Sequence, residues 1–376
     1  MTTPSSSRAT PHAIGRFQSL SHLLAPARIR ESLAVAPAPP LRNAAVAGLQ
    51  VSAAALIAVG LTHVSPWAHM EGYPALGALA ALFGRFAPAG GRMRIVTLAA
   101  LLLVASVALP SLAGLAGASP TLLLLCLAVL AGLLTVAVTQ LSIGGPGAVI
   151  FVFAASAALG HVDGWHTVVQ RCAFTAAGAA VAWLVCLLTD RLRVHTQLPA
   201  SGAAHARQPS HWLIAAARIA FCAACAAWLA QAAGLRFPAW AAIGTTAVLQ
   251  GAHLHVTMHR AVQRMVGTVL GAGIAGWILA NHPSFWTVLA LVLLLQFATE
   301  LVIGFNYVFG LVFVTPMALL MSSLTAPAAA AYMPMARVLD TALGALVGIV
   351  FALVFSSMDD RAYLAAHHAK GLPNKR

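Results

Sequence analysis

Apolar stretches long enough to cross a lipid bilayer recur along almost the whole chain. A membrane-spanning helix needs about 20 mainly apolar residues. In the first half this rule predicts spans near 43–63, 73–89, 95–115, 120–139, 147–162 and 165–189. In the second half it predicts spans near 213–234, 238–256, 263–281, 284–303, 306–325 and 333–357. We therefore expect an all-α, polytopic integral membrane protein with about twelve transmembrane helices.

The composition excludes an ordinary water-facing surface. Of the 376 residues, 60% are hydrophobic and 8% are charged, whereas a soluble domain carries about 25% charged residues. The formal net charge is +13, which in a soluble protein would suggest a nucleic-acid partner. Here most Lys and Arg residues lie beside apolar spans, as the positive-inside rule describes. We expect a multi-pass protein of the bacterial inner (plasma) membrane, with both termini cytoplasmic and no nucleic-acid partner.

A short motif suggests that the chain repeats itself. Arg-x3-Thr-x2-Gly occurs at Arg171–Gly178, Arg264–Gly271 and Arg337–Gly344. When the halves are overlaid, Tyr73 falls on Phe237 and Arg171 falls on Arg337. Six spans per half is an even number, which predicts two parallel repeats. The expected divisions are a mostly disordered tail (1–42), a first six-helix repeat (43–189), a linker (190–211), a second repeat (212–358) and a C-terminal tail (359–376).

The second half carries a recognisable set of residues. They are Trp240, Gln250, Thr257, Arg260, the Arg264–Gly271 motif, Glu300, Asn306-Tyr307, Thr315 and Arg337-x-x-Asp340-Thr341. This set resembles the fusaric acid resistance protein-like (FUSC) family of membrane proteins, which includes aromatic acid exporters. The resemblance implies a secondary transporter that exports small organic anions, aromatic carboxylic acids above all, in exchange for protons. Plant aluminium-activated malate channels resemble one half, so a passive anion channel is the first alternative. A membrane scaffold without transport is the second.

Charged groups within the spans are the candidate site residues, since each costs roughly 2.5–3.5 kcal/mol at a helix centre. Arg171 and Arg337 are expected to face one cavity between the halves and bind an anion, because a guanidinium contacts a carboxylate through two parallel hydrogen bonds. Arg264, Thr268 and Tyr307 are further candidates for the anion site.

Two acids are candidates for proton coupling, Glu300 and Asp340. Glu300 has a structural alternative, as a partner for Arg264 near the inner surface. Asp340 lies three residues after Arg337, on the same helix face, where the two can pair. A structural ion pair explains that spacing as well as a functional one. Arg171 has no such neighbour, since Phe174 occupies the matching position.

The glycines of the repeated motif predict close helix contacts, because small residues let helix backbones approach in lipid. They are Gly178, Gly267, Gly271 and Gly344. Trp240, Tyr307 and Phe309 offer rings for an aromatic substrate, although packing is the commoner role of such rings.

No motif points to catalysis, a metal or a cofactor. Cys222-x-x-Cys225 lies in an apolar segment and is interpreted as packing. His253, His255 and His259 form an H-x-H-x3-H pattern that could hold a metal, but a solvated loop is the ordinary explanation. Walker A, nucleophile-elbow, Rossmann and HExxH patterns are absent from the sequence, so we expect no enzyme activity. The expected partners are the lipid bilayer, a small organic anion, and an accessory periplasmic efflux subunit or a second copy of the chain.

Overall fold

The computed structural model describes residues 41–88, 90–194, 209–250, 254–325 and 327–355, and the regular secondary structure of these residues is helical, without any strand. In the first half the helices are α3 (Leu41–His63), α4 (Gly72–Ala78), α5 (Arg92–Leu115), α6 (Pro120–Gln140), α7 (Ala148–Ala157) and α8 (Trp165–Thr189). In the second half they are α9 (Pro209–Ala232), α10 (Pro238–Leu249), α11 (Leu254–Ala280), α12 (Phe285–Val302), α13 (Tyr307–Thr325) and α14 (Met333–Val354). Short 3-10 segments join them: η1 (Ala68–Met70), η2 (Leu79–Leu82), η3 (Asp190–Leu192) and η4 (Pro327–Tyr332).

Several helices begin where the sequence supplies a cap. The Ser119 hydroxyl accepts a hydrogen bond from the Leu122 amide at 3.3 Å, and Pro120 occupies the first turn of α6. Ser284 accepts from the Thr287 amide at 3.3 Å at the start of α12. Serine satisfies amides that lack a partner in the first turn, and proline gives up no hydrogen bond there. These helix starts therefore follow from local sequence.

Within the described residues, nine helices are long and apolar enough to cross a membrane. The apolar helices Gly72–Leu82, Ala148–Ala157 and Pro238–Leu249 are shorter than the 20 or so residues that a span needs. The all-helical, multi-pass character is thus confirmed, but the expectation of about twelve transmembrane helices is not. In the first short segment the helix stops at Phe83, whose backbone is extended, and Gly84 has a φ of +72°. A span predicted from hydropathy counts these apolar residues although they lie beyond the end of the helix.

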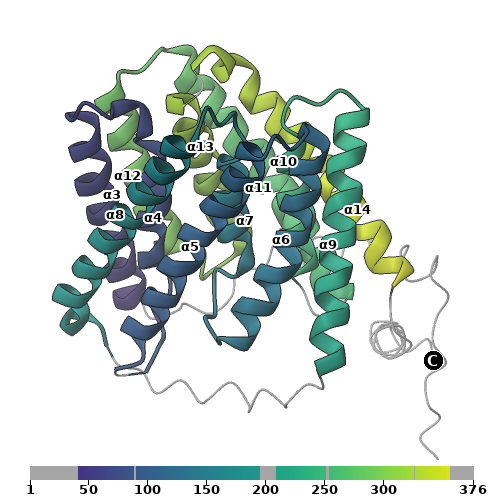
Figure 1. Cartoon of the computed structure of the whole chain (residues 1–376). Coiled ribbons are helices and arrows are strands. Elements are labelled where there is room, and N and C mark those ends of the chain that lie inside the picture. The colour runs from purple at the N-terminus through teal and green to yellow at the C-terminus, as the bar shows by residue number, and fades with distance from the viewer. Residues whose placement is uncertain (1–40, 89, 195–208, 251–253, 326, 356–376) are drawn as a thin grey trace, which may run out of the picture.

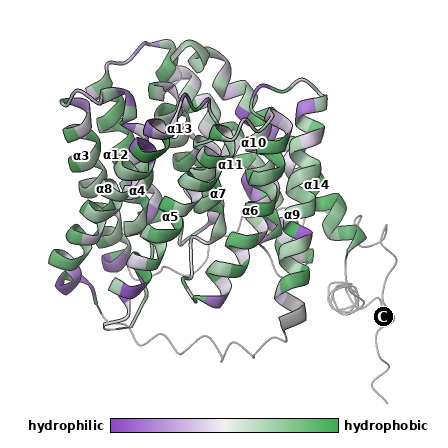
Figure 2. Cartoon of the chain, viewed as in Figure 1, coloured by the Kyte–Doolittle hydropathy of each residue, from purple (hydrophilic) through white to green (hydrophobic). Residues whose placement is uncertain are grey.

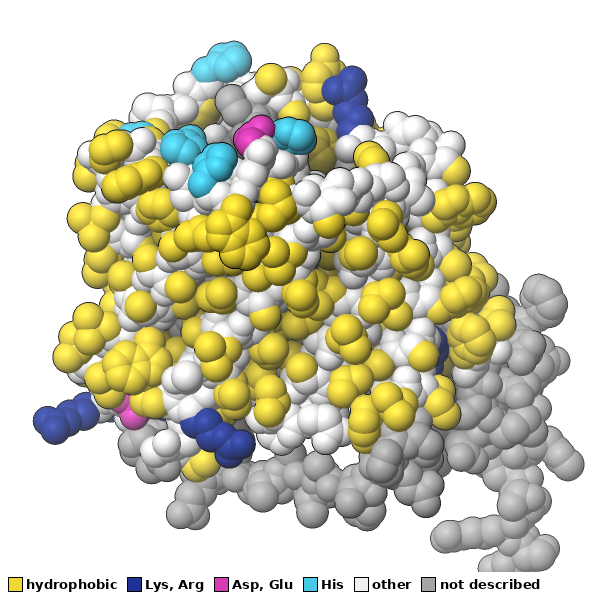
Figure 3. Space-filling model, viewed as in Figure 1, with side chains coloured by type: hydrophobic (Ala, Val, Ile, Leu, Met, Phe, Trp, Pro, Cys, Tyr) yellow, Lys and Arg dark blue, Asp and Glu magenta, His cyan; other side chains and the backbone are white. Residues whose placement is uncertain are grey.

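The outer surface of the bundle is apolar. Large side chains such as Trp277 (73% exposed) and Leu188 (72% exposed) point away from the protein. Figure 2 shows hydrophobic colour over the length of the helices and polar colour mainly near their ends. In Figure 3 hydrophobic side chains cover the middle of the molecule, while charged groups and histidines lie at its two ends. An apolar surface of this extent is stable against lipid but not against water.

Helices at matching places in the two halves pack in matching pairs. α4 packs on α8 as α10 packs on α14, and α5 contacts α7 and α8 as α11 contacts α13 and α14. A Cβ on Gly178 would collide with the Pro74 carbonyl, and one on Gly344 would collide with the Ala241 carbonyl. The halves meet where α3 packs on α12 and where α6 packs on α9, at opposite sides of the bundle in Figure 1. The two-repeat organisation itself stays a prediction.

Candidate functional site

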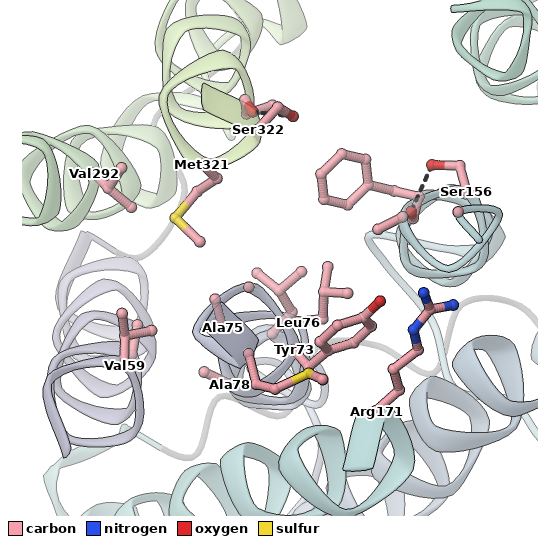
Figure 4. Close-up of a pocket in the computed structure, with 18 of the residues that line it drawn as sticks. Val59, Tyr73, Ala75, Leu76, Ala78, Ser156, Arg171, Val292, Met321 and Ser322 are labelled. Carbon is pink, nitrogen blue, oxygen red and sulfur yellow. Dashed lines mark hydrogen bonds between the residues drawn. The ribbon is translucent and has the colours of Figure 1, made fainter. Parts of the chain in front are cut away.

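A cavity of about 620 Å³ lies between the two halves of the chain. The first half contributes α3, α4, α7 and the start of α8 to its wall, and the second half contributes α10, α12, α13 and the first residue of α14. Figure 4 looks into it, with Tyr73, Arg171 and Ser156 on one side and Val292, Met321 and Ser322 across the space. Most of the wall is apolar, so a charged group within it has little competition from water.

Histidines mark the mouth of the cavity. His69, His161 and His166 belong to its lining, and so does Asp163. The His161 Nε2 atom lies 3.2 Å from an Asp163 carboxylate oxygen, and both side chains are mostly exposed. In Figure 3 histidines gather at the upper end of the molecule. The mouth is thus polar while the interior is not.

Arg171 is the one Arg or Lys of the cavity lining, and it is 7% exposed. Its Nη1 donates to the Ala158 carbonyl at 3.1 Å and to the Ser111 hydroxyl at 3.4 Å, and its Nη2 donates to the His161 carbonyl at 2.7 Å. The guanidinium lies 5.6 Å from the centre of the Tyr73 ring. Among the described residues no carboxylate lies within 4.0 Å of it. Arg171 therefore holds the carboxyl end of α7, where carbonyls collect, and keeps its positive charge uncompensated by an acid.

Flat rings and thioethers form much of the remaining wall. Tyr73, Phe153 and Trp240 line it together with Met317 and Met321. Trp240 stacks on Phe237 with a centroid distance of 4.3 Å. Aromatic faces and methionine sulfur are polarisable and adapt to a flat apolar ligand.

Arg337 does not share this cavity, contrary to the expectation from the sequence. Its guanidinium lies 5.0 Å from the centre of the Trp240 ring, and Trp240 belongs to the cavity lining whereas Arg337 does not. The pairing of Arg171 with Tyr73 matches that of Arg337 with Trp240. By these contacts Tyr73 corresponds to Trp240, whereas the sequence overlay set it on Phe237.

The other predicted anion-site residues also lie outside the cavity wall. Arg264 donates from Nη1 to the Tyr307 hydroxyl at 3.3 Å and is 4% exposed. Thr268, one turn later on α11, is 1% exposed. Phe309, proposed with Tyr307 and Trp240 as a stacking ring, is 43% exposed on the outer surface. Of the three rings, only Trp240 reaches the cavity.

The two candidate acids differ in their surroundings. Glu300 accepts from Arg85 Nη1 at 2.7 Å, so its partner is Arg85 and not Arg264. Asp340 is 0% exposed, and neither carboxylate oxygen has a hydrogen-bond partner. Asp340 makes no ion pair with Arg337 within 4.0 Å, which corrects the expected pair. The spacing permits that contact, but the rotamer of Arg337 takes its guanidinium to the Trp240 ring instead.

Two contacts between the halves were missed by sequence reasoning. The Arg85–Glu300 ion pair joins the segment after η2 to α12 across 215 positions of chain. The Gln250 amide, with its oxygen turned to the start of α7, accepts from the amides of Ala148 at 3.1 Å and Val149 at 2.9 Å. Local patterns carry no signal for contacts at such separation, and only correlated changes among relatives could have indicated them.

The motif glycines lie at close helix crossings. A Cβ on Gly267 would lie 2.9 Å from the Val308 carbonyl oxygen, and one on Gly271 would lie 3.0 Å from that of Val312. Both glycines of α11 therefore face α13. With Gly178 and Gly344 on α8 and α14, they mark three crossings that only a very small residue permits.

The cysteine pair and the histidine pattern are the two motifs that the sequence analysis did not assign to a site. Cys222 is buried and Cys225 partly buried, and both are free thiols. His253 lies outside the described residues, the side chain of His255 is not described, and His259 has a partner. In the parts of the chain that the structure describes, no group of three or more metal-ligating side chains comes together.

Comparisons with known proteins support the resemblance. Residues 219–351 match the family model described as "Fusaric acid resistance protein-like". The "Uncharacterized membrane protein YvaC" of Bacillus subtilis (strain 168) is 35% identical over 112 residues, which cover 30% of this chain and 18% of that protein. No solved structure matches the chain. The similar part thus spans less than a fifth of that relative's length, and the match to the family model lies within the second half of this chain.

Proposed function

We infer that this chain, an integral membrane protein whose residues 219–351 match the fusaric acid resistance protein-like family model, transports small organic anions out of the cell. The observation that carries the proposal is Arg171, a cation without an acidic partner in the wall of an apolar cavity between the halves. Aromatic carboxylates are the substrates that this cavity fits best.

The hydrogen bonds of Arg171 leave room for a carboxylate. A guanidinium has five N–H donors, and three of them are used by Ser111, Ala158 and His161. The two remaining donors suffice for one carboxylate held through two parallel bonds. The protein carbonyls also fix the guanidinium in place before the ligand arrives, so binding costs little side-chain entropy.

The size and wall of the cavity favour a ring attached to that carboxylate. Pockets for small organic ligands measure about 300–1,000 Å³, and this one measures about 620 Å³. Tyr73 lies beside Arg171, and Phe153 and Trp240 lie in the same wall. A ligand whose carboxylate reaches Arg171 therefore places its ring among aromatic faces.

The orientation of the bundle in the membrane is inferred from the distribution of charge. Among the described residues, Arg85, Arg191 and Arg193 gather at one, basic end of the bundle, and the histidine-lined mouth lies at the opposite end. Under the positive-inside rule, the basic end faces the cytoplasm of a bacterial inner membrane and the cavity opens outward. Both termini are then cytoplasmic, and an accessory periplasmic subunit or a second copy would meet the outer end.

Uptake of labelled benzoate into reconstituted vesicles tests the proposal. Arg171→Gln removes the cation and should weaken benzoate binding about 10- to 150-fold, because hydrogen bonds to charged groups contribute about 1.5–3 kcal/mol. Arg171→Lys should restore only part of the affinity, since an ammonium cannot contact both oxygens in the same way. Arg236→Gln is the matched control, because Arg236 lies outside the cavity, against the Tyr332 ring.

Three outcomes contradict the proposal or narrow it. Equal benzoate affinity in the Arg171→Gln and Arg236→Gln variants would remove Arg171 from the anion site. Benzoate current that does not depend on any ion gradient would assign the protein to passive channels. Silence of the folded wild-type protein towards benzoate and its larger analogues would favour a scaffold.

A further inference from the structure

We propose that Asp340 carries the proton that is exchanged for the anion, and that Arg337 and Trp240 connect it to the cavity. This inference rests on the proposed transport function. It places the proton on a residue that is 0% exposed and that does not belong to the lining of the cavity.

The first argument is the isolation of the Asp340 carboxyl group. It is 0% exposed, and both oxygens lack a hydrogen-bond partner, as does the neighbouring Thr341 hydroxyl. An ionised carboxylate without partners inside a membrane is strongly unfavourable. The neutral, protonated form of Asp340 is therefore the less costly form at this site. Glu300, the other candidate, already has its compensating cation in Arg85 at 2.7 Å.

The second argument is the position of Arg337, one helical turn from Asp340. It faces the Trp240 ring at 5.0 Å, and its Nε has no hydrogen-bond partner. Residues at i and i+3 of a helix lie on one face, so a change of rotamer brings the guanidinium to the Asp340 carboxylate. When Asp340 releases its proton, the resulting carboxylate attracts Arg337, which stays positive throughout. The contact with Trp240 is then lost.

Trp240 completes the connection, because its ring forms part of the cavity wall. It stacks on Phe237, which also lines the cavity. α10 and α14 are held together by a hydrogen bond of 2.8 Å from the Thr245 hydroxyl to the Gly344 carbonyl. Movement of Arg337 therefore acts on Trp240 across a fixed helix crossing. Protonation of Asp340 then changes the affinity of the cavity for the anion, and binding of the anion changes the affinity of Asp340 for the proton by the same factor.

The surroundings leave Arg337 as the charge that acts on Asp340. Arg264 of α11 donates to the Tyr307 hydroxyl of α13 at 3.3 Å, and neither side chain forms a hydrogen bond with Asp340. The α9 segment contains the titratable residues His211, Arg218, Cys222 and Cys225, and the α10 segment, PAWAAIGTTAVL, contains none. The first half has Phe174 at the position that matches Asp340. The proposed proton site therefore belongs to the second half alone.

The first experiment asks whether Asp340 is protonated, independently of transport. Infrared spectra of the purified full chain should show the carbonyl band of a buried carboxylic acid. This band should disappear in Asp340→Asn and persist in Glu300→Gln, the matched control. If Asp340→Asn does not fold, Asp340→Glu should shift the band instead. A band that survives unchanged in a folded Asp340 variant would overturn the proposal.

The second experiment measures how a pH gradient drives benzoate accumulation across the membrane of reconstituted vesicles, with the membrane potential clamped at zero. At one proton per anion, a gradient of one pH unit supports about tenfold accumulation. Asp340→Asn should reduce accumulation about tenfold, to the level without a gradient, while exchange at equal pH continues. Glu300→Gln should keep the dependence on the gradient.

The outcomes separate the two proposals. Wild-type benzoate flux that ignores the pH gradient, or gradient-driven accumulation that survives in Asp340→Asn, would overturn the proton site and leave the transport function intact. Absence of all flux would contradict the transport function, and the infrared band would still decide the protonation of Asp340.

Discussion

Replacing Gly271 by alanine should weaken the crossing of α11 and α13, and the structure gives the magnitude. The new Cβ would lie 2.7 Å from Thr315 Cβ, 2.9 Å from Pro316 Cδ and 3.0 Å from the Val312 carbonyl oxygen. None of these atoms is the far end of a flexible side chain. Carbon atoms normally approach to about 3.5–4.0 Å, so α13 must move away from α11. Overpacking of this kind costs about 1–3 kcal/mol.

Gly273→Ala on the same helix is the matched control. A Cβ at Gly273 would meet nothing within 4 Å. Both substitutions gain the same helix propensity, about 1 kcal/mol in water, so the difference between the two variants isolates the clash. Gly271→Ala should therefore be less stable than Gly273→Ala by about 1–3 kcal/mol, a factor of about 5 to 150 in the folded-to-unfolded ratio. Gly271→Leu should fail more severely, because a larger side chain enters the same space.

Unfolding in mixed micelles of mild detergent and dodecyl sulfate measures this difference, with thermal aggregation in detergent as a second readout. Equal stability of the Gly271→Ala and Gly273→Ala variants would refute the reasoning. It would mean that α13 yields without cost and that the crossing does not require a glycine.

Two further predictions concern the ends of the bundle. Arg85→Gln and Glu300→Gln should each destabilise the protein by about 1.5–3 kcal/mol, because each substitution leaves one partner of a charged hydrogen bond without the other. The double variant should lose less stability than the sum of the two single losses in micelle unfolding. Additive losses would show that the two side chains do not interact. In a cysteine-free background, Asp163→Cys should react with an impermeant thiol reagent applied to intact cells and Arg191→Cys should not, because these residues flank α8 at opposite ends; the reverse pattern would invert the proposed orientation.

The apolar runs and the charge pattern were sufficient to predict the class of this protein. A chain with 60% hydrophobic and 8% charged residues cannot cover itself for water, and each long apolar run must become a helix because lipid offers its backbone no hydrogen bonds. The helices therefore lie close to the predicted ranges. Hydropathy could not reveal that three of the runs form shorter helices, because it counts apolar residues that leave the helix, as at Phe83 and Gly84.

The Arg-x3-Thr-x2-Gly motif correctly drew attention to buried arginines and close crossings, since both follow from spacing on one helix. Spacing alone could not tell that Arg171 reaches a cavity while Arg337 turns to Trp240, or that Glu300 pairs with Arg85. Those outcomes depend on rotamers and on helices that meet across long stretches of chain. The sequence thus determined which charged groups lie within the membrane spans, because the free-energy cost of each such group depends on the apolar run that contains it. Only the tertiary structure decided which of them are compensated, because the compensating groups come from other helices.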